Sequence, residues 1–292
     1  YDPARRYGLT TTTVLQRIKE GASWETASTE LMGGEGSYGN GAAMRVSPVA
    51  LVYHHDPERM KRVVEESSRL THSHPLAIEG ALLLAEGMRF LLHLTPGEFQ
   101  AQEFLDELEK IAKSDQYLQK IEKIEKLLGT MPSFETVRSE LGCGSEAHNS
   151  VPSAIYSFVS NPHDFSACVL SAVALGGDTD TIASMAGALN GALNGRGAIP
   201  EEWVNKLENR AHIEATAREL FFLHVRKVLG NRCEMCLSEE KVRAYKLDPE
   251  APEEASSFIL LCDQCKMESE QEEKEFFARP RKHGKYRSIY RK

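Results

Sequence analysis

The sequence predicts an all-α protein that carries a small metal-binding module at its C-terminal end. Long stretches rich in Ala, Leu, Ile, Met and Glu fill residues 1–230, with apolar residues at helical spacing and few alternating β-branched runs. Gly, Ser and Pro separate these stretches, as expected for turns between helices. Beyond residue 230 the chain changes to short segments and charge clusters, where four cysteines form two Cys-x-x-Cys pairs.

In chain order, we expect helices over Thr10–Lys19, Pro57–Leu70, Ile78–His93, Glu98–Lys113, 115–128, Asp164–Leu175 and Ala211–Leu229. The segment 115–128 has its charges opposite one apolar stripe, made of Leu118, Ile121, Ile124 and Leu128. This pattern is typical of a surface helix docked on its own core. One strand is expected, at Phe258–Cys262. The predicted organisation is a helical core over 1–230, a metal module over 231–278 and a tail over 279–292.

The composition is that of an ordinary globular protein, with 41% hydrophobic and 27% charged residues in a chain of 292. No stretch approaches the roughly 18–20 uncharged apolar residues of a membrane span, so we expect no membrane partner. The first residues have neither an initiator Met nor an apolar signal core. We therefore expect an intracellular protein, cytoplasmic, nuclear or both, whose sequence begins inside a longer chain. The net charge of −8 argues against general affinity for nucleic acids.

The strongest chemical signal is the start of a helix after Gly176-Gly177, where Asp178, Asp180 and Thr181 fall within one turn. Small residues follow, and they predict close helix packing: Ala183, Ala186, Gly187, Ala188, Gly191 and Ala192. Unpaired carboxylates in such a buried crossing would be costly, and a cation removes that cost. Oxygen ligands without Cys or His favour Mg²⁺. The alternative is an ordinary N-cap and a carboxylate complementing the helix dipole.

Two further segments are unusual. Gly33–Arg45 has five glycines within nine residues, which suits a loop whose backbone N–H groups approach a phosphate, although such loops are more often linkers. It has no P-loop Lys and no preceding strand. Leu70-Thr-His-Ser-His74 places two histidines before a helix, and each alone is more typical of a core or capping residue.

Together and in this order, Gly36-Ser-Tyr-Gly-Asn-Gly-Ala-Ala-Met-Arg45, Leu70–His74 and Gly176-Gly-Asp-Thr-Asp-Thr-Ile-Ala-Ser-Met-Ala-Gly187 closely resemble the ADP-ribosylglycohydrolase family. Leu141-Gly-Cys-Gly followed by Ser150-Val-Pro-Ser-Ala-Ile-Tyr156 is similar to the branch that removes ADP-ribose from serine and degrades poly(ADP-ribose). The resemblance covers about residues 1–225.

The resemblance implies an all-α multi-helix bundle with two Mg²⁺ ions in a cleft. The implied reaction is hydrolysis of the O-glycosidic C1″ bond of ADP-ribose attached to protein serine or within poly(ADP-ribose). ADP-ribosylated proteins, the polymer and ADP-ribose are the implied partners. The implied metal ligands are Asp178, Asp180 and Thr181. The implied substrate-binding residues are Gly36, Ser37, Tyr38, Gly39, Asn40 and His72, with Tyr38 stacking on adenine. We expect His74 to be structural.

Two acidic motifs of the family, one holding the catalytic Glu, would lie before Tyr1 and are absent from these 292 residues. No catalytic residue can therefore be named, and we expect the chain as written to be a poor hydrolase. One alternative is a non-catalytic ADP-ribose-binding or structural member of the family. A second alternative is a hydrolase of ADP-ribosyl-arginine.

The C-terminal cysteines Cys233, Cys236, Cys262 and Cys265 form two pairs separated by 25 residues. Four thiolates with this spacing predict a closed, structural Zn²⁺ site, a zinc ribbon. The remaining cysteines, Cys143 and Cys168, are expected to be core thiols.

The tail 279–292 holds seven Lys and Arg and no Asp or Glu, with two tyrosines between them. It suits a polyanion such as DNA, RNA or poly(ADP-ribose), or a nuclear import signal. A solvated end without a partner is the alternative.

Overall fold

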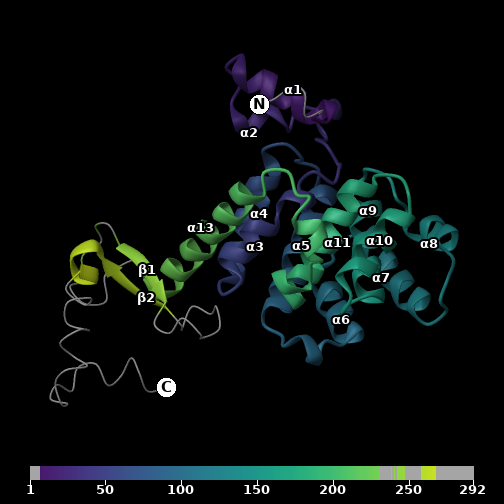
Figure 1. The fold of residues 1–292 in the computed structure, drawn as a ribbon. Coiled ribbons are helices and arrows are strands. Elements are labelled where there is room, and N and C mark those ends of the chain that lie inside the picture. The colour runs from purple at the N-terminus through teal and green to yellow at the C-terminus, as the bar shows by residue number, and fades with distance from the viewer. Residues whose placement is uncertain (1–6, 231–237, 239, 241, 247–257, 268–292) are drawn as a thin grey trace. The chain divides into compact units, whose positions relative to one another are not determined.

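The computed structural model describes residues 7–230, 238, 240, 242–246 and 258–267 (Figure 1). The chain divides into two compact units, Tyr1–Glu214 and Ala215–Lys292. This division falls within the helix Arg210–Leu229, earlier in the chain than the domain boundary expected near residue 230. None of the helices in the described part is long and apolar enough to cross a membrane.

The first unit is built of helices, and the predicted all-α class is confirmed. The α-helices are, in order, α1 (Leu9–Lys19), α2 (Trp24–Ala27), α3 (Ser47–Tyr53), α4 (Pro57–Arg69), α5 (Pro75–Leu92), α6 (Ala101–Ile111), α7 (Asp115–Leu128), α8 (Phe134–Leu141), α9 (Ala147–Ser160), α10 (Phe165–Ala174), α11 (Thr179–Asn194), α12 (Glu201–Val204) and α13 (Arg210–Leu229).

Capping residues explain why several predicted boundaries are close to the observed ones. Asp56 accepts a hydrogen bond from the backbone of Arg59 at 3.0 Å and fixes the start of α4, with Pro57 at its first position. Asp164 and Ser114 cap α10 and α7 in the same way. Helix α9 was not predicted, since Pro152 lies inside it and removes a backbone donor.

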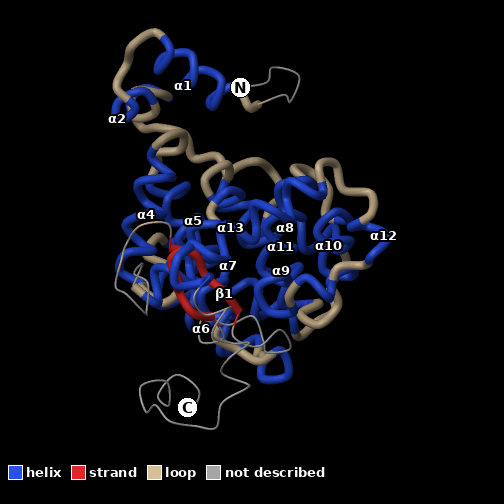
Figure 2. The backbone as a smooth tube through the Cα atoms, turned by 60° about the vertical axis from the view of Figure 1, so that its left-hand side comes forward, coloured by secondary structure: helices blue, strands red, loops and turns tan. Residues whose placement is uncertain are grey.

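The core of the first unit is centred on α5, α9 and α11, which pack against one another (Figure 2). Buried residues lie on nearly all sides of α5 and α9, as expected for central helices. Helix α7 docks on this core through one face, as predicted: Ile121 and Ile124 are buried, together with Tyr117 and Leu127. Leu118 and Leu128 are half-buried.

The second unit contains most of α13, from Ala215 onward, and a two-stranded antiparallel sheet. Strand β1 (Val242–Lys246) pairs with β2 (Phe258–Cys262), so that Val242 lies opposite Cys262. The predicted strand over 258–262 is confirmed. The small core of the second unit contains Val225, Val242, Phe258, Leu260, Leu261 and Cys265.

The predicted zinc ribbon is not tested by this structure. Cys233 and Cys236 lie outside the described residues, and the side chain of Cys262 is not among those described. Cys265 is buried. The basic tail 279–292 also lies outside the described residues.

Candidate functional site

The residues predicted to bind Mg²⁺ and substrate lie in the first unit, where the starts of three long helices meet the glycine-rich loop. The loop forms an isolated β-bridge between Gly39 and Glu146, just before α9. The backbone N–H of Ala147 donates to Tyr38 O at 2.9 Å, and that of Asn40 donates to Ser145 O at 2.8 Å. On the other side, His74, which precedes α5, donates to Ser37 O at 3.4 Å.

The loop requires glycine at Gly36. Its φ is +76°, which is the left-handed region, and a Cβ there would collide with Ser73 Oγ and lie 3.0 Å from the backbone nitrogen of His74. Glycine at this position therefore allows the loop to lie directly against the segment before α5.

The side chain of Asn40 connects the loop to the acidic start of α11. Asn40 is buried, and its Nδ2 donates to Asp178 Oδ2 at 2.7 Å and to Ser150 Oγ at 3.0 Å. The first bond joins two motifs that lie 138 positions apart in the sequence. Two segments singled out independently in the sequence are thus brought into one site.

The backbone before α11 turns sharply to present the two aspartates. Gly176 and Gly177 have φ of +75° and +69°, and a Cβ on Gly177 would collide with Cys143 O. Asp178 N donates to the same oxygen at 2.8 Å. Although Asp178 stands at the N-cap position, its carboxylate caps no backbone N–H of α11. The alternative of an ordinary capping aspartate therefore does not describe this side chain.

The carboxylate of Asp178 instead accepts hydrogen bonds from two side chains. Its second oxygen, Oδ1, accepts from Thr181 Oγ1 at 3.1 Å. Burial raises the pKa of Asp178, and the neighbouring Asp180 adds to this rise, although the bond from Asn40 opposes it. The pKa of Asp180 is lowered, mainly by its hydrogen bond with Asp178. The two carboxyl groups are thus close enough to compete for one proton.

This donor set fits a divalent cation. Two carboxylates and a hydroxyl lie together, and among the described residues no Lys or Arg forms an ion pair with either Asp178 or Asp180. Hard oxygen ligands of this kind suit Mg²⁺. A cation at this position would offset the repulsion from Asp180, which adds to the effect of burial on the pKa of Asp178.

His72 lies under the loop with little exposure, 6% of its surface. Burial is the main cause that lowers its pKa, and the charge of Arg45 acts in the same direction; together they bring the pKa to about 4. His74 plays a different role, since its Nδ1 accepts from Leu76 N at 3.1 Å and caps α5. The expectation that His74 is structural agrees with this geometry.

Tyr38 is the exposed member of the loop, at 43% of its surface. Its ring lies beside two imidazoles, with centroids 5.7 Å from His74 and 6.4 Å from His148. Ser37 is buried beneath it at 4%. An exposed aromatic face next to buried polar groups is able to stack on a planar ligand.

Several residues of the site were not predicted from the sequence to belong to it. They are Arg45, Thr71, Cys143, His148 and Ser150, which contact the predicted residues. All except His148 fall within segments singled out in the sequence, and His148 lies between two of them. No local pattern indicated which of their atoms would face the site.

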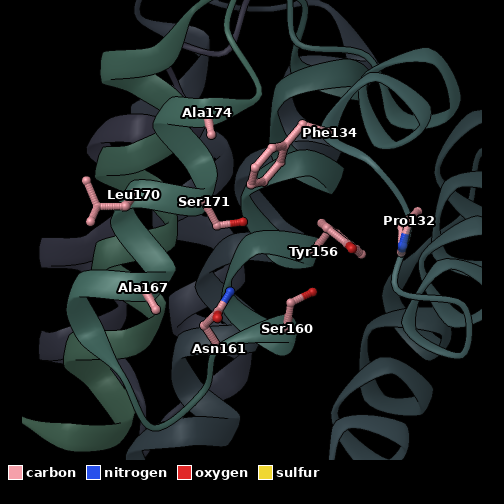
Figure 3. A pocket seen from close by; sticks show the side chains of 9 residues that line it. All are labelled: Pro132, Phe134, Tyr156, Ser160, Asn161, Ala167, Leu170, Ser171 and Ala174. Carbon is pink, nitrogen blue, oxygen red and sulfur yellow. The ribbon is translucent and has the colours of Figure 1, made fainter.

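A hollow of about 510 Å³ lies elsewhere in this unit, between α8, α9 and α10 (Figure 3). Phe134 of α8, Tyr156 of α9 and Ser171 of α10 are among the residues that line it. None of the residues predicted to bind metal or substrate lines it.

Comparison with known proteins agrees with the geometry of the site. The family model described as ADP-ribosylglycohydrolase matches residues 1–228, which include the loop, the His72 segment and the start of α11. The chain belongs to the ADP-ribosylglycohydrolase family. The prediction of this family, and of a hydrolase acting on ADP-ribose, is confirmed at that level.

Members of the family with related sequences include two mammalian proteins. The chain is 34% identical over 248 residues to ADP-ribosylhydrolase ARH3 of Mus musculus, an alignment covering 75% of this chain and 66% of the mouse protein. It is also 34% identical over 248 residues to ADP-ribosylhydrolase ARH3 of Homo sapiens, covering 75% of this chain and 68% of the human one. The chain thus spans about two thirds of the length of these relatives.

A solved structure has the same fold as this chain. It is described as an ADP-ribosylglycohydrolase-related protein complex, with a TM-score of 0.59 and 27% sequence identity. The match covers 75% of this chain and 70% of that one.

Proposed function

We propose that the protein binds ADP-ribose at the loop and hydrolyses its O-glycosidic C1″ bond, with Mg²⁺, when ADP-ribose is attached to protein serine or lies within poly(ADP-ribose). The observation that carries this proposal is the hydrogen bond from Asn40 to Asp178, which joins the glycine-rich loop to the acidic turn. A ligand held by the loop would therefore reach a metal held by the aspartates.

The loop supplies the binding of an anion. The N-termini of α5, α9 and α11 all meet it through the contacts of Ser37, Tyr38 and Asn40. Helix N-termini carry partial positive charge and unpaired N–H groups, which favour a diphosphate without a basic surface. The exposed ring of Tyr38 is placed to stack on adenine.

The proposed metal ligands are Asp178, Asp180 and Thr181, in line with two Mg²⁺ per site in the family. When bound, Mg²⁺ supplies positive charge that orients the ribose hydroxyls and stabilises charge as the glycosidic bond breaks. Asn40 and Thr181 hold the carboxylate of Asp178 in a fixed orientation. Two relatives are named ADP-ribosylhydrolases, which supports an ADP-ribosylated partner. The specific partners in this proposal are ADP-ribosylated proteins and poly(ADP-ribose).

The test is release of free ADP-ribose by the full-length protein from serine-linked, arginine-linked and polymeric substrates. We expect release from the serine-linked peptide and the polymer, and a loss of about 100-fold or more in Asp180→Asn, because several kcal/mol of charge stabilisation depend on the metal. Asp106→Asn, an exposed aspartate on α6, is the matched control. Undiminished release by Asp180→Asn would overturn the metal assignment. Binding of ADP-ribose without any release would favour the alternative of a non-catalytic family member. Faster release from the arginine-linked substrate would favour the alternative of an ADP-ribosyl-arginine hydrolase.

A further inference from the structure

His72 is connected to the guanidinium group of Arg45 through the hydroxyl group of Thr71. Arg45 Nη2 donates to Thr71 Oγ1, and Thr71 Oγ1 lies 2.7 Å from His72 Nδ1. Arg45, in the glycine-rich segment, and Thr71, in the segment before α5, are 26 positions apart in the sequence. The three side chains therefore form one short chain of hydrogen bonds.

The direction of these hydrogen bonds follows from their chemistry. A guanidinium group only donates, so Thr71 Oγ1 must accept from Arg45. The Thr71 hydroxyl hydrogen then needs an acceptor, and within the described part of the chain His72 Nδ1 is the one in hydrogen-bond distance. An imidazole nitrogen that accepts a hydrogen bond carries no proton. The proton of a neutral His72 is therefore on Nε2.

His72 is held in the neutral form by its surroundings. The side chain is buried, and the positive charge of Arg45 lies one hydroxyl away, so a second proton on the ring is disfavoured by burial and by repulsion. No other charged group contributes to the lowered pKa of His72. His72 is thus a neutral hydrogen-bond donor at neutral pH.

The Nε2 atom faces the glycine-rich loop. A Cβ on Gly41 would lie 2.7 Å from this nitrogen, and one on Gly39 would lie 3.2 Å from it. No described residue accepts a hydrogen bond from Nε2. Glycine at both positions therefore leaves the N–H uncovered by side chains from the loop that is proposed to hold ADP-ribose.

We propose that Arg45 and Thr71 are positioning residues that fix His72 as the neutral Nε2–H tautomer, so that His72 donates a hydrogen bond to an oxygen of the ADP-ribose diphosphate or ribose. This inference rests on the proposed ADP-ribose site. It adds a specific role for Arg45 and Thr71, which act through His72.

The first test reads the tautomer directly, without ligand or activity. In the full chain with ¹⁵N-labelled histidine, two-bond ¹H–¹⁵N correlation spectra at pH 7 distinguish protonated from unprotonated ring nitrogens, and His72→Gln assigns the signal. We expect an unprotonated Nδ1 and a protonated Nε2. Thr71→Val should shift the population toward Nδ1–H, and Thr71→Ser should restore the wild-type pattern because it keeps the hydroxyl. A protonated Nδ1 in the wild type, or no change in Thr71→Val, overturns the inference.

The second test measures the affinity for ADP-ribose of the same proteins, with Mg²⁺ present. Loss of one hydrogen bond predicts weaker binding by about tenfold in Thr71→Val, with Thr71→Ser close to wild type. Thr136→Val, on α8, is the matched control. If wild-type protein binds no ADP-ribose, the proposed function fails and the ligand contact of His72 fails with it, whereas the tautomer result stands on its own. If Thr71→Val weakens binding without a change of tautomer, the positioning role is wrong.

Discussion

At the scale of single residues, the site uses burial to set the chemistry of its polar groups. Asn40 and His72 are buried and Asp178 is half-buried, and each of the three is held by side-chain hydrogen bonds. Burial raises the pKa of Asp178 and lowers that of His72, since in both cases the charged form loses solvation. The same burial makes the orientation of each group definite.

The lowered pKa of His72 predicts a dependence of stability on pH. A histidine in the unfolded chain has a pKa near 6.5, against about 4 when folded, so the unfolded state binds more protons between these values. Stability contributed by neutral His72 is present above pH 6.5 and is lost as the pH falls toward 4. From pH 7 to pH 5 we expect a loss of roughly 2 kcal/mol in the free energy of unfolding from this residue.

Urea unfolding of the wild type and of His72→Gln at both pH values measures this contribution. Between pH 7 and pH 5, the free energy of unfolding should fall by roughly 2 kcal/mol more in the wild type than in His72→Gln. His163→Gln, an exposed histidine, is the matched substitution. Equal losses in wild type and His72→Gln would show that His72 is not buried as a neutral base.

At the scale of elements, the central helices pack closely because glycine and small residues face their neighbours. Gly80 of α5 lies against Tyr117 of α7, whose hydroxyl donates to Leu76 O at 3.0 Å. Gly87 of the same helix packs beside Phe104 and Leu189. This packing holds α5 in place, and α5 in turn positions the His72 segment that precedes it.

Alanine substitutions at two glycines in helix interiors test this packing, one at a crowded position and one at an open position. A Cβ at Gly80 would collide with the Tyr117 hydroxyl and lie 3.3 Å from Val151 Cγ2, whereas a Cβ at Gly191 of α11 would meet nothing within 4 Å. We expect Gly80→Ala to lower the free energy of unfolding by about 1–3 kcal/mol through overpacking. Gly191→Ala should raise it by about 0.5–1 kcal/mol through better helix propensity. Chemical denaturation measures both, and equal effects of the two substitutions would contradict the packing of α5 on α7.

At the scale of the whole molecule, a helical unit is followed in the sequence by a small unit with a two-stranded sheet. The family match ends at residue 228, at the end of α13. Among the described residues of the second unit, the small core contains few apolar side chains, which is typical of modules that depend on a metal ion for folding. We propose that Cys233, Cys236, Cys262 and Cys265 bind one structural Zn²⁺.

Metal analysis of the full chain, purified without chelator, tests this site. We expect about one Zn²⁺ per chain, retained against exchange, because four thiolates form a closed tetrahedral set. Cys262→Ser should lose the ion, whereas Cys168→Ala should keep it, since Cys168 is buried among α10 and α11 and burial raises the pKa of its thiol to about 12. Wild-type protein without zinc, or zinc retained in Cys262→Ser, would overturn the ribbon.

Much of the fold could be predicted because it depends on local signals. Asp56, Ser114 and Asp164 mark helix starts by capping the adjacent backbone, and the apolar stripe of 115–128 marks its buried face. These interactions lie within one or two turns, so the pattern of residue types is sufficient. Helix α9 was missed because Pro152 has the opposite local preference, and packing in the core outweighs it.

The motifs of the site were also visible as residue types, and the family followed from their order. Their connections were not, because the hydrogen bonds from Asn40 to Asp178 and from Arg45 to Thr71 join segments distant in the sequence. The burial that lowers the pKa of His72 likewise arises only when the loop folds over the segment before α5. Residue types follow from the chain alone, whereas the partner, orientation and protonation of each group depend on which distant segments the packed helices bring together.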